Sequence, residues 1–313
     1  MSPENAVVMV GTLRKELADE LSRRHGAREL GELPDGPAKG VRVAVTSGVW
    51  GVRAEHLDRL PDLQAVVSFG VGYDSTDVAE CHRRGIAVSN TPDVLTDCVA
   101  DLAVGLLIDV MRGLSAADRS VRRGDWEAGR QPALARRVTG SQVGILGLGR
   151  IGSAIARRLE AFGCTISYHN RRQRDDVSYR YASSVVELAE GCDALVVAAA
   201  GGAASAGIVD AEVLKALGPD GYLVNVARGS VVDEPALVRA LGTDELAGAA
   251  LDVFTDEPHV PAPLLEDDRV IVLPHIGSAT IETRAAMTEL TLANVAQALS
   301  DGTLVTPVPP SGS

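Results

Sequence analysis

The sequence predicts an α/β fold of two doubly wound, mostly parallel sheets. Three observations support this fold class. Short apolar runs alternate with helix-compatible stretches along the whole chain, as in sheets covered by helices on both faces. The length of 313 residues is that of about two domains. A glycine-rich turn at 146–152, between an apolar run and a helical stretch, marks the start of a second series of strands.

The first series occupies the N-terminal third. Its strands are expected at 6–10, 41–46, 63–69 and 86–89. Helix-compatible stretches such as 12–24 and 54–59 separate them. The segment Asn90-Thr91-Pro92-Asp93 breaks the pattern, because the residue before a proline is pushed to extended geometry. A long amphipathic helix is then expected from Thr96 to Met111.

The second series follows the glycine-rich turn. Its strands are expected at 143–146, 165–168, 194–198, 222–226, 248–251 and 270–273. Six strands with intervening helices match a complete dinucleotide-binding (Rossmann) domain. Helices are expected at 153–161, after the glycines, and at 280–299, near the end of the chain. Ligands of this fold class usually lie in a cleft between two such domains.

The glycine motif G-x-G-x-x-G gives each glycine a task. Gly147 allows a tight turn, Gly149 leaves space for a pyrophosphate against bare backbone, and Gly152 lets the helix pack closely on the strand. The helix start, with Arg150 and Ile151, would then hold the anion through free N–H groups and the helix dipole. The alternative is a purely structural strand-to-helix turn, but the strand before and the helix after favour a dinucleotide site.

Composition narrows the class of protein. The 42 acidic and 30 basic side chains argue against nucleic acid or an anionic membrane as the main partner. Lysines occur only at Lys15, Lys39 and Lys215, so a phosphate clamp must use arginine. No signal peptide or membrane-spanning run of about 18 residues is visible, so a cytoplasmic location is expected. The four cysteines show no C-x-x-C spacing, and no metal site is expected.

The second strand after the glycines selects the dinucleotide. It usually ends in Asp or Glu, which accepts from the adenosine ribose hydroxyls. Here the strand leads into Asn170, whose side chain has no charge to repel a 2′-phosphate. Arg171 and Arg172 follow, and their guanidinium groups match the geometry of a phosphate with paired donors. Asp175 and Asp176 come several residues too late to be the ribose acid. The pattern favours NADP(H), with NAD(H) possible; the alternative is a solvated basic turn.

Three residues in the last third follow predicted strands of the cofactor domain. They are Arg228, Glu257 and His275. Strand ends of a parallel sheet are where ligands sit, so the three could converge on one site. Each alone has an ordinary explanation: a turn cap, a solvated loop acid and a hydrogen-bonded loop histidine. Together they are the groups that hydride transfer to a carbonyl requires.

These residues, with their spacing and flanking sequence, resemble the D-isomer-specific 2-hydroxyacid dehydrogenases, and most of all the glyoxylate/hydroxypyruvate reductases. The resemblance covers nearly the whole chain, with matching motifs at 70–74, 146–152, 225–233, 249–258 and 274–280. It implies a Rossmann cofactor domain at 94–281, inserted into a flavodoxin-like substrate domain formed by 1–93 and 282–313.

The resemblance also implies roles. His275 would protonate the carbonyl oxygen as hydride arrives at C2, and Glu257 would hydrogen-bond to the other ring nitrogen and orient the ring. Arg228 would hold the substrate carboxylate and carbonyl oxygen. The backbone N–H groups of Val71 and Gly72 would bind the other side of that carboxylate. An ordinary glycine turn is the alternative for the last pair.

The cofactor site would extend, by the same resemblance, to Thr96, Ala227, Asp252 and Gly277. Asp252 would meet the nicotinamide side, and Thr96 the nicotinamide or its phosphates. A buried strand-end acid and a helix cap are equally good explanations for these two. Trp50 either narrows the substrate pocket or packs internally, and Trp126 is expected at the interface of a homodimer.

The expected activity is NADPH-dependent reduction of a small 2-oxo acid to the D-2-hydroxy acid. One alternative is a dehydrogenase of another small anion; formate dehydrogenases of this type pair the histidine with glutamine, so Glu257 speaks against that choice. Another is a dinucleotide-sensing scaffold such as the C-terminal-binding corepressors, which share the fold. The sequence leaves the identity of the 2-oxo acid open.

Overall fold

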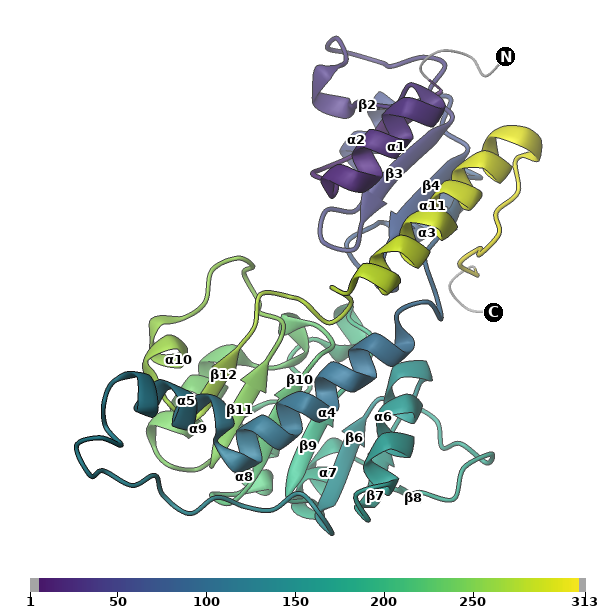
Figure 1. The fold of residues 1–313 in the computed structure, drawn as a ribbon. Coiled ribbons are helices and arrows are strands. Elements are labelled where there is room, and N and C mark those ends of the chain that lie inside the picture. The colour runs from purple at the N-terminus through teal and green to yellow at the C-terminus, as the bar shows by residue number, and fades with distance from the viewer. Residues whose placement is uncertain (1–5, 310–313) are drawn as a thin grey trace. The chain divides into compact units, whose positions relative to one another are not determined.

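The computed structural model describes residues 6–309. The chain divides into two compact units (Figure 1). The smaller unit contains the residues up to Leu95 and those from Ala279 onwards, and the larger unit is Thr96–Ser278. The larger unit is thus inserted into the smaller one. These boundaries lie two to three residues from the expected ones, at the starts of two long helices.

The smaller unit is built on a five-stranded parallel sheet of order β2-β1-β3-β4-β5. Its strands are β1 (Val7–Met9), β2 (Arg28–Glu29), β3 (Val43–Ser47), β4 (Ala65–Phe69) and β5 (Ala87–Ser89). This is the order 2-1-3-4-5 of flavodoxin-like folds, the class that the family resemblance implied for this domain. Strand β2 was not predicted, because it has two exposed residues and no apolar run.

Helices cover both faces of this sheet. They are α1 (Lys15–His25), α2 (Ala54–Arg59), α3 (Val78–Arg83), α11 (Ile281–Asp301) and the short turn η1 (Leu30–Glu32). Figure 1 shows α1 and α11 together on one face. Alternate strand residues such as Val8, Ala44 and Val66 pack with Leu57 of α2 and Cys81 of α3 in one hydrophobic cluster. The strands are apolar on both faces because both faces are buried.

The larger unit contains a seven-stranded parallel sheet of order β12-β11-β10-β9-β6-β7-β8. Its strands are β6 (Gln142–Leu146), β7 (Thr165–His169), β8 (Arg180–Tyr181), β9 (Ala194–Val197), β10 (Tyr222–Asn225), β11 (Gly248–Leu251) and β12 (Val270–Val272). Counted from β6, this is the Rossmann order 3-2-1-4-5-6 with a seventh strand at the edge. The expected count of six was wrong: it omitted β8, whose two residues form no apolar run, and took β12 for the sixth strand.

Helices of the larger unit lie on both sides of its sheet. They are α4 (Thr96–Arg112), α5 (Leu114–Arg122), α6 (Arg150–Glu160), α7 (Val185–Glu190), α8 (Ala211–Leu217), α9 (Glu234–Gly242) and α10 (Ala262–Glu266), with the short turns η2 (Ala203–Ser205) and η3 (Gly229–Val231). Helices α4 and α6 pack together, and α8 packs against both α7 and α9. Helix α6 begins three residues before the expected position, because Gly149 already has extended backbone and acts as its N-cap.

Residues 6–309 contain no helix that is long and apolar enough to span a bilayer. In the same residues, no group of three or more His, Cys, Asp or Glu side chains could hold a metal ion.

The four cysteines are free thiols. Burial raises the pKa of Cys81 to about 11 and that of Cys192 to about 12, so both stay protonated and behave as small apolar side chains.

Candidate active site

The three motif glycines lie in three different environments. Gly147 has a φ of 96°, and a Cβ there would lie 2.5 Å from Ala199 Cα. A Cβ on Gly152 would lie 2.2 Å from the carbonyl oxygen of Gly147. At Gly149 no described atom comes within 4 Å of the Cβ position. Packing therefore requires the first and third glycines, whereas the second leaves open space beside the backbone, as close approach of a pyrophosphate requires.

The N-terminus of α6 faces this open space. Its first residues, Arg150 and Ile151, follow the N-cap Gly149, which has no side chain to accept their N–H groups. The first N–H groups of a helix lack intrahelical partners and carry the positive end of the dipole. This end of the 11-residue helix suits the phosphates of a dinucleotide.

Asn170 stands directly after β7, where NAD-binding proteins usually carry an acid. Its Oδ1 accepts a hydrogen bond of 2.7 Å from the N–H of Leu148, between the first two motif glycines. Because an amide NH₂ cannot accept from that N–H, the orientation of the side chain is fixed and its NH₂ donors remain for other partners. Arg171 and Arg172 follow as exposed side chains.

Arg228, Glu257 and His275 follow the adjacent strands β10, β11 and β12. All three strands are parallel, so the residues lie at the same edge of the sheet. His275 Nδ1 and Glu257 Oε2 are 2.8 Å apart. The two side chains are 36% and 24% exposed, respectively, so the pair is partly covered and still reachable by a small ligand.

Glu257 is held in its ionised form. Burial raises the pKa of this carboxyl, but the hydrogen bond and charge of His275, the N–H of Phe254 and the charge of Arg228 outweigh burial and lower the pKa below 4.5. Oε1 accepts the Phe254 N–H at 3.1 Å. An ionised carboxylate can only accept, so Nδ1 of His275 is the donor, and Nε2 is the ring atom that can exchange a proton with a ligand.

Asp252 shapes the backbone around His275. The residue is 1% exposed, and its Oδ1 and Oδ2 accept the N–H groups of Ile276 and Gly277 at 2.7 and 2.8 Å. Its carbonyl oxygen accepts the His275 N–H at 2.9 Å. His275 has a φ of 53°, a left-handed conformation that costs a non-glycine residue about 1–3 kcal/mol. Asp252 supplies the bonds that hold it there; burial raises the pKa of this carboxyl and outweighs the two N–H donors.

Arg228 is positioned by a residue that the sequence did not single out. Asn225 is 1% exposed; its Nδ2 donates to the Arg228 carbonyl at 2.9 Å, and its Oδ1 accepts the Ala227 N–H at 3.0 Å. Arg228 Nη1 donates to the Ala227 carbonyl at 2.7 Å. A Cβ on Gly229 would lie 1.9 Å from the carbonyl carbon of Phe254, so this turn packs directly on the loop that carries Glu257.

The other predicted cofactor contacts of the larger unit lie near this edge of the sheet. Thr96 is the first residue of α4. A Cβ on Gly277 would lie 3.0 Å from Asp252 Oδ2 and 3.4 Å from a methyl of Val99, in the first turn of the same helix. Ala227 is buried beside Asn225. In the larger unit, the predicted catalytic residues therefore lie close to the predicted cofactor contacts, around the ends of β10, β11 and β12. These contacts are Thr96, Ala227 and Gly277.

In the smaller unit, Val71 and Gly72 follow β4. Asn90 Nδ2 donates to the Val71 carbonyl at 2.8 Å, and Thr91 Oγ1 accepts the Gly70 N–H at 3.1 Å. The sequence treated Asn90 and Thr91 only as a chain break before Pro92, whereas their side chains anchor this loop. Trp50 is 50% exposed, and its ring lies against Gly11, where a Cβ would be 2.2 Å from Trp50 Cγ.

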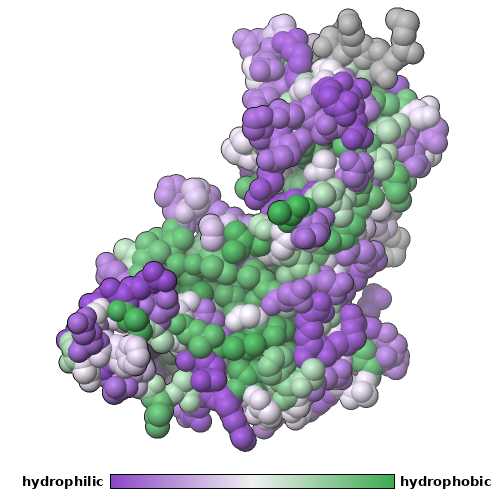
Figure 2. All heavy atoms as spheres, viewed as in Figure 1, coloured by the Kyte–Doolittle hydropathy of each residue, from purple (hydrophilic) through white to green (hydrophobic). Residues whose placement is uncertain are grey.

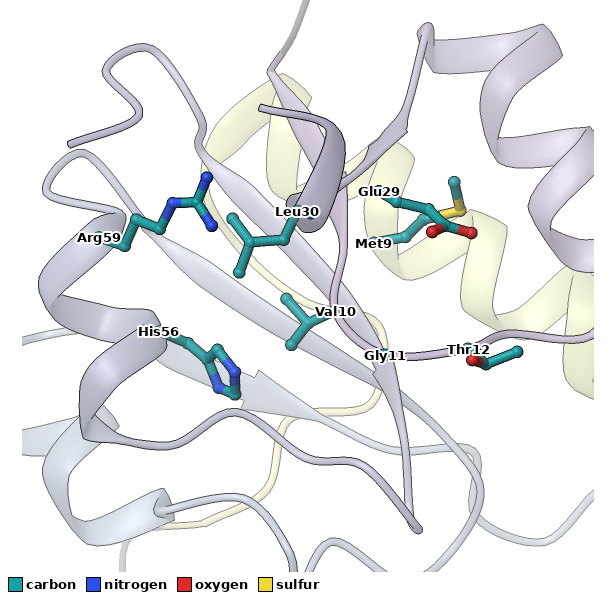
Figure 3. Close-up of a pocket in the computed structure, with 9 residues that line it drawn as sticks. Met9, Val10, Gly11, Thr12, Glu29, Leu30, His56 and Arg59 are labelled. Carbon is teal, nitrogen blue, oxygen red and sulfur yellow. The ribbon is translucent and has the colours of Figure 1, made fainter. Parts of the chain in front are cut away.

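A separate cavity of about 320 Å³ lies in the smaller unit (Figure 3). The residues that line it are Met9, Val10, Gly11, Thr12, Glu29, Leu30, Gly31, His56 and Arg59. Figure 3 shows His56 and Arg59 directed toward Val10 and Leu30. His56 Nδ1 accepts the Arg53 N–H at 3.0 Å, and Arg59 Nη2 donates to the Leu33 carbonyl at 2.7 Å. Both side chains have structural partners, and no predicted site residue lines this cavity.

Comparison with known proteins shows the family to which the chain belongs. Residues 104–277 match the family model for the NAD-binding domain of D-isomer-specific 2-hydroxyacid dehydrogenases. The chain is 44% identical over 308 residues to glyoxylate/hydroxypyruvate reductase A HPR2 of Arabidopsis thaliana, covering 96% of this chain and 98% of that protein. It is 48% identical over 271 residues to a hydroxyphenylpyruvate reductase of Plectranthus scutellarioides, covering 87% and 86%.

Solved structures agree with the sequence comparison. The NADPH-dependent glyoxylate/hydroxypyruvate reductase of Sinorhizobium meliloti, in complex with NADP and malonate, is similar with a TM-score of 0.91 and 41% identity over 97% of both chains. A 2-hydroxyacid dehydrogenase of Ketogulonicigenium vulgare is similar with a TM-score of 0.89 and 37% identity, covering 98% of this chain and 99% of that one. The chain therefore belongs to the D-isomer-specific 2-hydroxyacid dehydrogenase family and is an NAD(P)-dependent oxidoreductase.

Proposed function

We propose that the protein uses NADPH to reduce a small 2-oxo acid, of the glyoxylate or hydroxypyruvate kind, to the D-2-hydroxy acid. The observation that carries this proposal is the 2.8 Å contact between His275 Nδ1 and the ionised Glu257, with Arg228 on the adjacent strand end. The names of the similar Arabidopsis and Sinorhizobium proteins support the substrate class. The open space at Gly149 and the N-terminus of α6 fit a dinucleotide.

Each side chain of the proposed site has one task. The residues at 147–152 and 170–172 would hold the dinucleotide, which supplies the hydride when bound. His275 donates the proton on Nε2 to the substrate carbonyl oxygen, and Glu257 keeps the ring oriented through its contact with Nδ1. Arg228 binds the substrate carboxylate with paired donors and fixes the face that is presented.

The remaining assignments follow from the same proposal. Asp252 holds the backbone of 275–277, and Thr96, Ala227 and Gly277 border the nicotinamide side. In the smaller unit, the N–H groups of Val71 and Gly72 bind the substrate carboxylate, in a loop that Asn90 and Thr91 keep in place.

A panel of 2-oxo acids tests the proposal. The protein is incubated with NADPH and glyoxylate, hydroxypyruvate, pyruvate or bulkier aromatic 2-oxo acids, and oxidation of NADPH is followed. Turnover of at least one acid is expected. Tight NADPH binding without turnover on any acid would instead indicate a dinucleotide-sensing scaffold. Oxidation of formate with NADP and no turnover of 2-oxo acids would indicate a dehydrogenase of another small anion.

The preference for NADPH is assigned to Arg171 and Arg172. Alanine at both positions is expected to raise the Michaelis constant for NADPH at least about tenfold and that for NADH less than about twofold, because hydrogen bonds to a phosphate are lost. Arg157→Ala is the matched control: it removes an exposed arginine from the far end of α6. Equal effects of the double variant on both dinucleotides would contradict the assignment.

We also propose that the protein is a homodimer that uses the face carrying α5. Large apolar side chains are exposed there and in the segment that follows: Leu114 (49%), Val121 (54%), Trp126 (64%) and Leu134 (103%). Figure 2 shows hydrophobic residues gathered on the face of the larger unit that carries α4 and α5. A second copy of the chain would remove these side chains from water.

A further inference from the structure

The loop after β7 and the glycine-rich turn are joined at one residue. Leu148 lies between Gly147 and Gly149 and is 1% exposed. Its N–H donates to Asn170 Oδ1 at 2.7 Å, and its carbonyl oxygen accepts from Arg174 Nη1 at 2.9 Å. Both backbone polar groups of Leu148 are thus bound by side chains of the same neighbouring loop.

Arg174 extends this connection to α6. The same Nη1 donates to Ser153 Oγ at 2.9 Å, in the first turn of the helix. On its other side, Arg174 Nε donates to Asp176 Oδ1 at 2.9 Å, and Nη2 donates to Asp176 Oδ2. The guanidinium therefore bridges a carboxylate of its own loop to the turn and to the helix start. A planar guanidinium with five donors can do this, whereas an ammonium cannot make the same fork.

The backbone of Arg174 is fixed as well. Its N–H donates to the hydroxyl of Tyr168 at 2.9 Å, and that hydroxyl donates to the Arg174 carbonyl at 3.2 Å. Tyr168 is 1% exposed in β7 and packs edge-on against Tyr181 of β8, with ring centroids 5.5 Å apart. The backbone of Arg174 is therefore fixed to strand β7 through Tyr168. The contact of its guanidinium with Leu148 then fixes the glycine-rich turn relative to the sheet.

We propose that Arg174 is a positioning residue that holds the glycine-rich turn in the form that binds the dinucleotide pyrophosphate. This inference rests on the proposed function. It separates Arg174 from Arg171 and Arg172: their guanidinium groups are exposed and serve the 2′-phosphate, whereas that of Arg174 is 30% exposed and engaged with Leu148, Ser153 and Asp176. The pyrophosphate is common to both dinucleotides, so Arg174 contributes to affinity and not to the choice between them.

Equilibrium binding of NADPH and NADH to Arg174→Ala tests the proposal, with Arg172→Ala and Arg157→Ala as controls. Arg174→Ala is expected to raise both dissociation constants by the same factor, about tenfold, because charged hydrogen bonds to the turn are lost. The turnover number at saturating NADPH should stay within about twofold of the wild type. Arg172→Ala should weaken NADPH binding alone, and Arg157→Ala neither.

Two more variants separate positioning from a general loss of stability. Arg174→Lys keeps the charge and one contact, so both affinities should recover in part. In a double-mutant cycle, Ser153→Ala should cost less in the Arg174→Ala background than in the wild type, because the two residues share a hydrogen bond. This coupling in affinity would not arise if Arg174 affected only the melting temperature.

The outcomes can be told apart. A selective loss of NADPH affinity in Arg174→Ala would mean that Arg174 binds the 2′-phosphate directly and would overturn the positioning role. Unchanged affinity for both dinucleotides would overturn it too. Failure of the wild type to bind either dinucleotide would overturn the proposed function itself. If Arg174→Ala does not fold, Arg174→Lys takes its place, both in the binding measurements and as the background for Ser153→Ala.

Discussion

His275→Ala is expected to lower the turnover number for reduction of a 2-oxo acid by about 10²–10⁴, the usual contribution of a general acid. The substitution removes the ring whose Nε2 gives the proton, and it leaves Asn170 and the glycine-rich turn, which bind the dinucleotide, untouched. The dissociation constant for NADPH should therefore stay within about twofold. Steady-state kinetics at saturating NADPH, together with equilibrium binding, measure the two effects separately.

His259→Ala is the matched control. His259 lies in the loop after β11, two residues from Glu257, and pairs with the exposed Asp256 at 3.6 Å. Its loss should leave turnover unchanged. Near-normal turnover in His275→Ala would remove His275 as the acid. Loss of NADPH binding in the same variant would mean that the change in rate reports a distorted cofactor site.

Glu257→Gln is expected to lower the turnover number at least about tenfold, because the orientation of the His275 ring is lost. Both carboxylate oxygens of Glu257 accept hydrogen bonds, one from His275 Nδ1 and one from the Phe254 N–H. Glutamine has a single acceptor oxygen, and its NH₂ group cannot accept, so one of these two bonds must be lost. Steady-state kinetics at saturating NADPH measure the effect, and equilibrium binding of NADPH should be unchanged. Turnover close to that of the wild type would contradict the orienting role of Glu257.

The fold could be predicted because the two kinds of element leave different patterns in the sequence. Strands buried on both faces of a parallel sheet are continuous apolar runs, whereas the helices between them also carry polar residues on their exposed side. The expected strands at 41–46 and 248–251 correspond to β3 and β11. Strands β2 and β8 could not be found this way. Each has two residues at or near a sheet edge, and its pairing depends on backbone hydrogen bonds that leave no mark on side-chain hydrophobicity.

The same contrast holds at the candidate site. Arg228 and His275 could be proposed as site residues because they follow neighbouring buried strands of a parallel sheet, whose ends are where ligands usually bind. Asn225, Asn90 and Arg174 could not, because they act on the backbone of neighbouring residues. A polar side chain that binds a carbonyl or an N–H can do so from many sequence positions. The three-dimensional path of the turn decides which polar side chain lies within hydrogen-bond distance of a given backbone group, and the sequence does not show that path.

Gly152→Ala and Gly149→Ala are expected to fail in different ways, although the two glycines are three residues apart. Alanine stabilises a helix interior by up to about 1 kcal/mol relative to glycine, which would favour it at Gly152 in α6. The new Cβ would, however, lie 2.2 Å from the Gly147 carbonyl oxygen, which is a backbone atom and cannot rotate away. The overlap exceeds the helix gain, so the free energy of unfolding should fall by about 1–3 kcal/mol, and dinucleotide binding should be lost with the turn.

Gly149→Ala is expected to have little effect on stability and a large effect on dinucleotide binding. The backbone at Gly149 is extended, with φ −85° and ψ −155°, and its Cβ position is open, so the free energy of unfolding should change by less than about 1 kcal/mol. The methyl group instead occupies the space that a pyrophosphate needs, so both dinucleotides should bind at least about tenfold more weakly. Denaturant unfolding and equilibrium binding on the two variants distinguish these cases. Normal NADPH affinity in Gly149→Ala would mean that the pyrophosphate does not cross this turn. In that event α6 would no longer be the anion site, and the assignments of Arg171 and Arg174, which are placed relative to it, would lose their basis.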